Sequence, residues 1–177
     1  MITELPSRVG RLLVTPGVLE HSRELFDPFR SRNVEGCLLW YGYVLDGDTC
    51  IVTTCVRPTQ ASYATTYAIP AASMRDVRRQ VRPHNLLLLV QIHSHPAKAF
   101  FSDWDEDHAL NNRMGALNMI VPDYGNARWI DTGRFCMVER NDAGQWERWS
   151  AADWGRLVTI PDALAPPANY DRHRQAS

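Results

Sequence analysis

No sign of charge dominates this sequence. Its 177 residues carry 19 Lys and Arg against 20 Asp and Glu, which gives a formal net charge of −1. Proteins that bind nucleic acid usually show a basic excess, so the composition argues against that class of partner. One group of arginines recurs at helical spacing and indicates a solvated helix face, with a charged docking patch as the alternative. These residues are Arg75, Arg78, Arg79 and Arg82.

The sequence also lacks closely paired cysteines. Cys37, Cys50, Cys55 and Cys136 form no C-x-x-C pair, and each lies in or beside an apolar run, so we expect buried free thiols. The first residues lack a basic segment followed by an apolar one, so no secretory signal is expected. The longest apolar run, residues 86–90, is far shorter than a membrane-spanning helix requires. We therefore expect a reducing, cytoplasmic location without membrane association.

The sequence does contain a mixture of strand-like and helix-like segments, and 45% of its residues are apolar, enough for a core. Strands are expected at residues 9–14, 35–45, 50–56, 86–93, 116–121, 134–139 and 145–149. Helices are expected at residues 16–30, 70–81 and 102–112, with a last short helix after Ser150. Strands and helices do not alternate strictly, so the pattern predicts the α+β class, a mixed β-sheet flanked by helices.

The length fits one domain, which we expect over residues 1–160. Residues 161–177 are rich in Ala, Pro and charge and are expected to form a flexible C-terminal tail. Residues 58–69 and 122–133 are expected to be loops.

His93 and His95 lie two residues apart where an apolar run ends. Residues i and i+2 of a strand point to the same face, so both imidazoles can bind one metal ion. Asp105 follows a short loop later and can supply a third ligand. Two His and one Asp leave one open position on a tetrahedral zinc, which is the arrangement of catalytic sites. Histidines that merely satisfy hydrogen bonds are the alternative.

A hydrolytic zinc site also needs a general base, because the metal lowers the pKa of its water and a carboxylate takes the proton. Glu35 is a candidate, since it opens the very apolar segment 35–45. An acid in that place is either an exposed strand end or an active-site acid, and the local sequence leaves both interpretations open. Ser102 lies three residues before Asp105, so the two would share one face of a helix.

As a set, Glu35, the His-Ser-His-Pro run that begins at His93, Ser102 and Asp105 resemble the JAMM motif of the JAB/MPN metallopeptidase family. The order is that of the motif: a Glu, then His-Ser/Thr-His-Pro, a short loop, Ser, two residues and Asp. The resemblance covers nearly the whole chain, and residues 120–124 also resemble small bacterial members. It implies the JAB/MPN fold, an architecture similar to that of cytidine deaminases.

One spacing departs from the family pattern. The loop between Pro96 and Ser102 holds five residues, one fewer than in many members. This departure leaves Asp103 as an alternative metal ligand, although the Ser-x-x-Asp spacing favours Asp105.

The resemblance implies a role for each residue of the motif. His93, His95 and Asp105 would bind one Zn²⁺ per chain. Glu35 would accept a proton from the water that the zinc activates and later pass it to the leaving amine. Ser102 would stabilise the oxyanion as the carbonyl becomes tetrahedral. No protein nucleophile, and so no covalent intermediate, is expected.

The family resemblance further implies a zinc-dependent isopeptidase or peptidase acting at the C-terminal tail of a ubiquitin-like protein or its conjugate. Small bacterial members resemble deconjugating peptidases of ubiquitin-like systems, including antiphage defence systems, so activating and conjugating enzymes are expected partners. Two alternatives remain: a maturation peptidase for a sulfur-carrier-type precursor, and a non-catalytic MPN scaffold. The complete ligand set argues against the scaffold. Residues 58–69 and 122–133 are expected to frame the substrate groove.

For three side chains near the motif, the sequence allows more than one role. Phe100 and Trp104 either line the substrate groove or pack in the ordinary way. His108 follows Asp105 by one helical turn, and we expect it behind the ligands or at the surface rather than on the metal.

Overall fold

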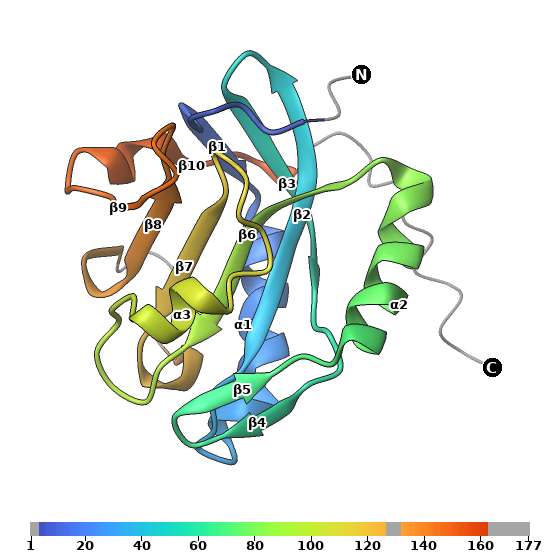
Figure 1. Cartoon of the computed structure of the whole chain (residues 1–177), viewed down its shortest axis with the longest axis vertical. Helices are drawn as coiled ribbons and strands as arrows, with labels where there is room; N and C mark the ends of the chain where they lie inside the picture. Colours follow the sequence, from blue (N-terminus) through green and yellow to red (C-terminus); the bar gives the residue numbers. More distant parts are fainter. Residues whose placement is uncertain (1–3, 127–131, 163–177) are drawn as a thin grey trace.

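The structure, a computed structural model, describes residues 4–126 and 132–162 (Figure 1). In chain order its strands are β1 (Arg11–Val14), β2 (Cys37–Asp46), β3 (Thr49–Val56), β4 (Ala61–Tyr63), β5 (Thr66–Ala68), β6 (Leu87–Ser94), β7 (Leu117–Val121), β8 (Cys136–Arg140), β9 (Trp146–Arg148) and β10 (Leu157–Thr159). Its α-helices are α1 (Pro16–Arg30), α2 (Ala71–Val81) and α3 (Asp103–Asp107). Short 3-10 turns are η1 (Arg82–His84), η2 (Asp123–Gly125), η3 (Thr132–Arg134) and η4 (Asp153–Arg156).

In the described residues one sheet contains eight strands in the order β10-β1-β3-β2-β6-β7-β8-β9. The pairs β1/β10, β1/β3 and β6/β7 are parallel, and the other neighbours are antiparallel. Strands β4 and β5 form a separate antiparallel hairpin. The sheet is therefore mixed and flanked by helices, and the predicted α+β class is confirmed.

The two faces of the sheet carry different helices because side chains alternate along each strand. Leu38 and Trp40 of β2 are fully buried in the core that α1 completes with Phe26. Leu39, between them, faces the opposite way and packs in a second core with Val77 of α2. In Figure 1, α1 lies behind the sheet and α2 stands to its right.

Helix α1 begins as the sequence predicts. The Thr15 side chain accepts a hydrogen bond from the Val18 amide, and Pro16 occupies the first turn. Helix α2 buries Met74, Val77 and Val81, which recur at the spacing of one helical face.

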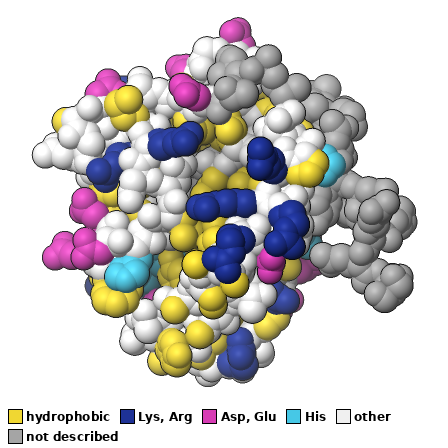
Figure 2. All heavy atoms as spheres, turned by 45° about the vertical axis from the view of Figure 1, so that its right-hand side comes forward, with side chains coloured by type: hydrophobic (Ala, Val, Ile, Leu, Met, Phe, Trp, Pro, Cys, Tyr) yellow, Lys and Arg dark blue, Asp and Glu magenta, His cyan; other side chains and the backbone are white. Residues whose placement is uncertain are grey.

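The opposite face of α2 and the first residue of η1 carry the arginines singled out above. Arg75, Arg78, Arg79 and Arg82 are all exposed. Figure 2 shows Lys and Arg side chains gathered on this side of the molecule. Their exposure is what both a solvated helix face and a charged docking patch require.

Three local predictions are wrong. Residues 58–69 were expected to be a loop, but they contain the β4–β5 hairpin, whose strands of three residues are too short to show a pattern. The helix expected to reach residue 112 ends at Asp107, because the Gln91 side chain accepts the Leu110 amide and the Leu88 carbonyl accepts the Asn111 amide group. These bonds draw the chain toward the edge of β6. The short strand β10 was not expected.

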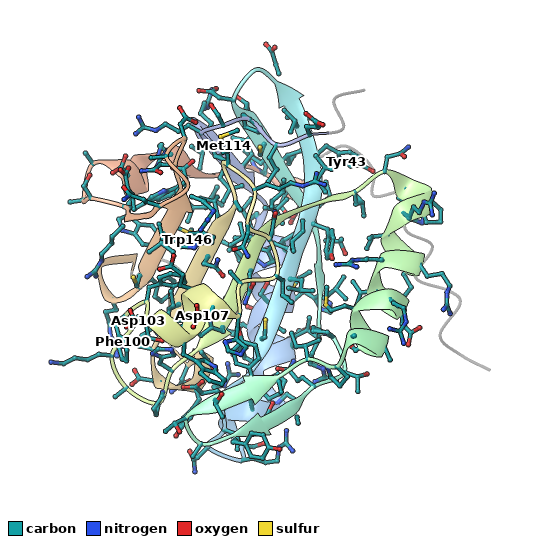
Figure 3. The ribbon with its side chains drawn as sticks, viewed as in Figure 1. Tyr43, Phe100, Asp103, Asp107, Met114 and Trp146 are labelled. Atoms are coloured by element: carbon teal, nitrogen blue, oxygen red, sulfur yellow. The ribbon has the colours of Figure 1, made fainter. Side chains whose placement is uncertain are left out.

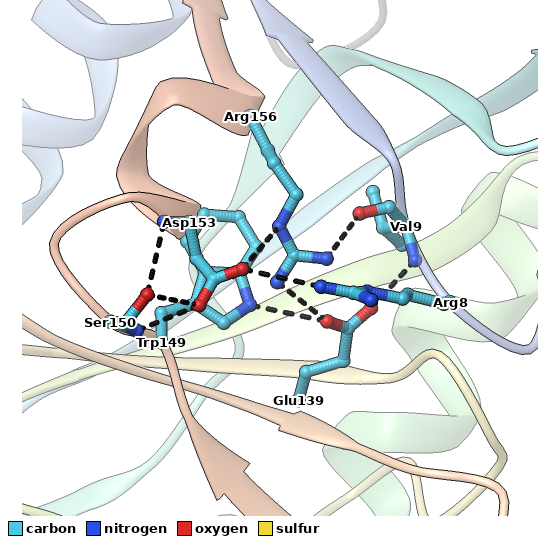
Figure 4. A network of polar contacts seen from close by, with 7 residues as sticks. All are labelled: Arg8, Val9, Glu139, Trp149, Ser150, Asp153 and Arg156. Atoms are coloured by element: carbon cyan, nitrogen blue, oxygen red, sulfur yellow. Dashed lines mark hydrogen bonds and ion pairs between the residues drawn. The ribbon is translucent and has the colours of Figure 1, made fainter.

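An ion pair between buried Glu139 and partly buried Arg156 holds β10 in place (Figure 4). The Glu139 carboxylate accepts hydrogen bonds from the Val9 amide at 2.6 Å and the Trp149 indole at 3.2 Å. It also pairs with Arg156 at 2.8 Å, and Arg156 donates to the Val9 carbonyl at 2.7 Å. The network joins the segment before β1 to the segment before β10, so the first and last strands meet in parallel.

All four cysteines are buried and free, as predicted. None of the described helices is long and apolar enough to cross a membrane. The tail predicted from residue 161 lies outside the described residues after position 162.

Candidate metal centre

His93 lies near the end of β6, one of the central strands of the sheet. Its neighbour Ile92 is fully buried in the α1 core, so the imidazole of His93 points to the opposite face. His95 follows directly after β6, and its amide donates to the Val121 carbonyl at 2.9 Å. Exposure is 0% for His93 and 6% for His95, so the polypeptide rather than solvent sets where both rings point.

Asp105 reaches the two imidazoles from α3. Its Oδ2 accepts hydrogen bonds from the Ser102 amide at 2.8 Å and the Ser102 hydroxyl at 2.7 Å. The Asp105 amide in turn donates to the Ser102 hydroxyl at 3.3 Å, which completes a capping box. With Oδ2 held in this way, Oδ1 lies 3.0 Å from Nε2 of His93.

The three side chains bring one ligand atom each to a common point, all within 4.8 Å of one another. The two Nε2 atoms lie 3.1 Å apart, and Nε2 of His95 lies 3.7 Å from Oδ2 of Asp105. Ligands about 2.0–2.1 Å from a tetrahedral ion are separated by about 3.3 Å, and the two distances from Nε2 of His93, 3.1 Å to Nε2 of His95 and 3.0 Å to Oδ1 of Asp105, are close to that value. The residues fit a divalent metal ion, and their N and O donors are those that zinc accepts.

The protonation states of His95 and Asp105 also suit metal binding, because metal ligands must be deprotonated. Burial, together with the neighbouring His93, lowers the pKa of His95 to about 4. Burial alone would raise the pKa of Asp105, but the hydrogen bond and charge of His93 and the bonds from Ser102 outweigh it and hold the pKa near 2. At neutral pH both groups are ready to bind a cation.

Glu35 is buried beside this cluster, with 5% of its surface exposed. It precedes β2 by two residues instead of opening the strand, as the sequence had suggested. Its amide donates to the Tyr63 carbonyl at 2.7 Å. Burial, and secondarily the charge of Asp105, raises the pKa of Glu35 to about 8. Of the two interpretations left open by the sequence, the exposed strand end is excluded.

Ser102 lies at the site, whereas Asp103 does not. Ser102 lines the same cleft as Glu35 and Asp105, and its hydroxyl donates to Asp105. Asp103 is exposed on the first turn of α3 and lies outside the group of three potential ligands (Figure 3). His108 is also exposed, and its ring stacks on Trp104.

Sequence reasoning missed Tyr67 and Gln91. The Tyr67 ring lies tilted beside His93, with ring centroids 5.6 Å apart. The Gln91 amide group donates to the Tyr67 hydroxyl at 2.9 Å, while its carbonyl accepts the Leu110 amide at 2.8 Å. This chain of bonds ties β5 to β6 beside the cluster. A signal existed in the sequence, because Gln91 is a lone polar residue in an otherwise apolar run.

His95 and Asp105 line a cleft of about 520 Å³, whereas His93 is fully buried and is not part of that lining. Thr65, Thr66 and Tyr67 of the hairpin form part of its lining, so the segment 58–69 contributes to the groove as expected. The described residues of the segment 122–133 are absent from that lining, although the Tyr124 amide donates to the His95 carbonyl at 2.8 Å. Residues 127–131 lie outside the described residues.

Known proteins share this architecture. A protein of Desulfitobacterium hafniense, DSY2949, has a solution structure that superposes with a TM-score of 0.61 at 15% identity, covering 85% of this chain and 94% of that one. A protein of Salinibacter ruber gives a TM-score of 0.53 at 20% identity, covering 90% and 98% of the two chains. At these identities the likeness concerns the fold alone.

Two sequence matches show more than a shared fold. A protein of Sinorhizobium fredii named probable metalloprotease y4jG is 27% identical over 129 residues, which span 71% of this chain and 79% of that protein. Residues 29–152 match the family model described as prokaryotic homologs of the JAB domain. This span contains Glu35, the histidine pair, Ser102 and Asp105. The chain therefore belongs to the prokaryotic JAB-domain family.

Proposed function

We propose that this protein is a zinc-dependent metallopeptidase whose metal is held by His93, His95 and Asp105. The observation that carries the proposal is the convergence of these three ligand atoms beside a cleft whose lining includes His95, Asp105 and the buried acid Glu35. Membership of the JAB-domain family supports it, as does the likeness to a relative named as a probable metalloprotease.

A bound zinc ion would supply Lewis acidity to the scissile carbonyl and to the attacking water. Glu35 accepts the proton of that water and returns it to the leaving amine. Burial raises the pKa of Glu35 to about 8 while the site holds no cation, and a cation held by His93, His95 and Asp105 would lower it toward the ionised form that accepts a proton. Ser102, whose hydroxyl donates to Asp105 in this structure, would donate to the developing oxyanion during the reaction.

The proposed substrate is a ubiquitin-like modifier, cut at its C-terminal tail from a conjugate or a precursor. An extended tail would add to the β4–β5 hairpin as a further strand, held by main-chain hydrogen bonds. The hairpin supports this docking mode, because among the described residues its two strands pair only with each other and its turn lines the cleft. The proposed setting is a bacterial, cytoplasmic conjugation system, such as those of antiphage defence, with its activating and conjugating enzymes.

Metal analysis and two substrates test the proposal. We expect about one zinc per chain, lost in His95→Ala and retained in Glu35→Gln. The parent protein should release a modifier joined through a lysine side chain, whereas Glu35→Gln should lose 100-fold or more of its turnover, within the range of general acid–base catalysis. Cleavage of a linear fusion alone would identify a maturation peptidase. A protein that binds partners but no metal would identify a scaffold and refute the proposal.

A further inference from the structure

Two large aromatic side chains beside the proposed metal site are exposed to solvent. Phe100 is 54% exposed and Trp104 is 58% exposed. Both line the cleft that contains Glu35, His95 and Asp105. In the described part of the chain the exposed large hydrophobic residues are Leu45, Tyr63, Phe100, Trp104 and Met114. Two of these five therefore lie in one cleft, where ordinary packing does not account for them.

Both rings are held in place despite their exposure. Trp104 stacks on His108 with ring centroids 3.9 Å apart and an interplanar angle of 19°. The His108 ring nitrogen Nδ1 also lies 2.8 Å from the Trp104 carbonyl oxygen. Phe100 meets the His95 ring edge-on, with centroids 4.6 Å apart. Rings that are already ordered lose little conformational freedom when a ligand covers them, which favours binding.

The rest of the cleft carries little charge. Thr65, Thr66 and Tyr67 stand on the hairpin side, and Pro96 and Ala97 follow His95. Apart from the acids and His95 of the proposed site, the only ionisable cation in this lining of described residues is Lys98. The volume of about 520 Å³ lies within the range of small-ligand pockets. A mostly apolar cleft of this size is suited to an uncharged, apolar group.

From this arrangement we propose that Phe100 and Trp104 form a specificity subsite for a large apolar side chain, such as Leu or Phe, within two residues of the scissile bond. The inference rests on the proposed peptidase function and narrows its substrate class. A peptide with only glycine or small polar residues around the cleaved bond leaves both rings exposed. A peptide with a bulky apolar residue covers them and gains the free energy of removing their surface from water.

A set of fluorogenic peptides that differ at single positions on either side of the bond tests the subsite. The parent protein should cleave the best Leu or Phe peptide with a kcat/KM at least tenfold above that of the matched Ser peptide. In Phe100→Ala and Trp104→Ala this ratio should fall by tenfold or more, chiefly through KM. Phe100→Leu, which keeps an apolar side chain against His95, should restore much of it. Met114→Ala removes an equally exposed apolar side chain outside the cleft and should preserve the ratio.

A binding measurement separates this inference from the proposed activity. Zinc-loaded Glu35→Gln protein should bind the Leu or Phe peptide at least tenfold more tightly than the Ser peptide in calorimetry, and the added change Trp104→Ala should remove the difference. This preference would support the subsite even if the parent protein cleaved no peptide, in which case only the proposed function fails. Equal cleavage and equal binding of the two peptides, or a preference that survives both alanine substitutions, would overturn the subsite.

Discussion

The Ser94 hydroxyl accepts a hydrogen bond from the Gly36 amide at 3.0 Å, and the Gly36 carbonyl accepts the Ser94 amide at the same distance. Ser94, which lies between the two proposed histidine ligands, thus makes two hydrogen bonds to Gly36, which follows Glu35. This pair of bonds fixes the proposed base relative to the metal ligands. Gly36 is itself confined, because a Cβ atom there would lie 2.3 Å from the Phe29 ring.

Ser94→Ala should therefore reduce kcat by roughly tenfold, because small displacements of a positioned group are costly in catalysis. The zinc content should be retained. Stability should fall by about 1–3 kcal/mol, since the buried Gly36 amide loses its acceptor. Ser22→Ala is the matched control: Ser22 is also fully buried and accepts a hydrogen bond from Trp40 at 2.8 Å, but far from the cleft. Its stability loss should leave kcat unaltered. Equal kcat losses in both variants would contradict the positioning role.

The raised pKa of Glu35 predicts a pH dependence of stability in zinc-free protein. The pKa of Glu35 is about 8 in the folded state and 4.5 in the unfolded chain, so between these values the folded state binds more protons and stability falls as pH rises. His95 acts in the opposite direction, because its pKa falls from 6.5 to about 4 and stability rises with pH over that window. The pKa of Asp105 falls from 3.8 to about 2, so the stability that this group contributes is lost only below pH 3.8.

The window between pH 6.5 and 8 therefore isolates Glu35. Urea denaturation of zinc-free protein should show a loss of about 1–2 kcal/mol across it. Glu35→Gln cannot ionise and should flatten the dependence. A slope that persists in this variant would assign the titration to another group.

Tyr67 is predicted to anchor the hairpin that flanks the cleft. Tyr67→Phe removes the hydroxyl that accepts a hydrogen bond from the Gln91 amide group. The loss should lower the free energy of unfolding by about 1–3 kcal/mol and loosen β5. We expect faster amide hydrogen exchange over residues 61–68 and a raised KM for substrates with an extended tail, while zinc stays bound. Tyr41→Phe alters a buried tyrosine in the same α2-facing core and serves as the control. Identical exchange over the hairpin in both variants would exclude the anchoring role.

Sequence reasoning reached the fold class and the identity of the clustered side chains because both depend on short-range patterns. The i, i+2 spacing of His93 and His95 on a strand sets their common face, whatever the rest of the chain does. The burial of Glu35 could not be predicted, since it depends on the Tyr63 carbonyl and on Ser94, which lie 28 and 59 positions later in the sequence. The hairpin was missed for a related reason: three-residue strands carry no periodicity.

Ser102 and Ser150 offer a matched pair for the last prediction, because both make the same bonds to an Asp three residues on. The Ser102 amide and hydroxyl reach Asp105 at 2.8 and 2.7 Å, and those of Ser150 reach Asp153 at 2.8 and 2.7 Å. Only the first carboxylate faces the histidines. Ser102→Ala should free Asp105 to rotate and lower its preference for the ionised form.

We expect Ser102→Ala to weaken zinc binding by about 10- to 100-fold, the usual effect of removing a partner of a metal ligand, in competition with a fluorescent chelator. The turnover of protein kept saturated with zinc should fall further, because the proposed oxyanion donor is also lost. Ser150→Ala removes the matching hydroxyl bond to Asp153, which should cost about 1 kcal/mol of stability and leave the zinc affinity unchanged. If both variants bound zinc as tightly as the parent protein while the turnover of Ser102→Ala still fell, Ser102 would serve the oxyanion and not the orientation of Asp105.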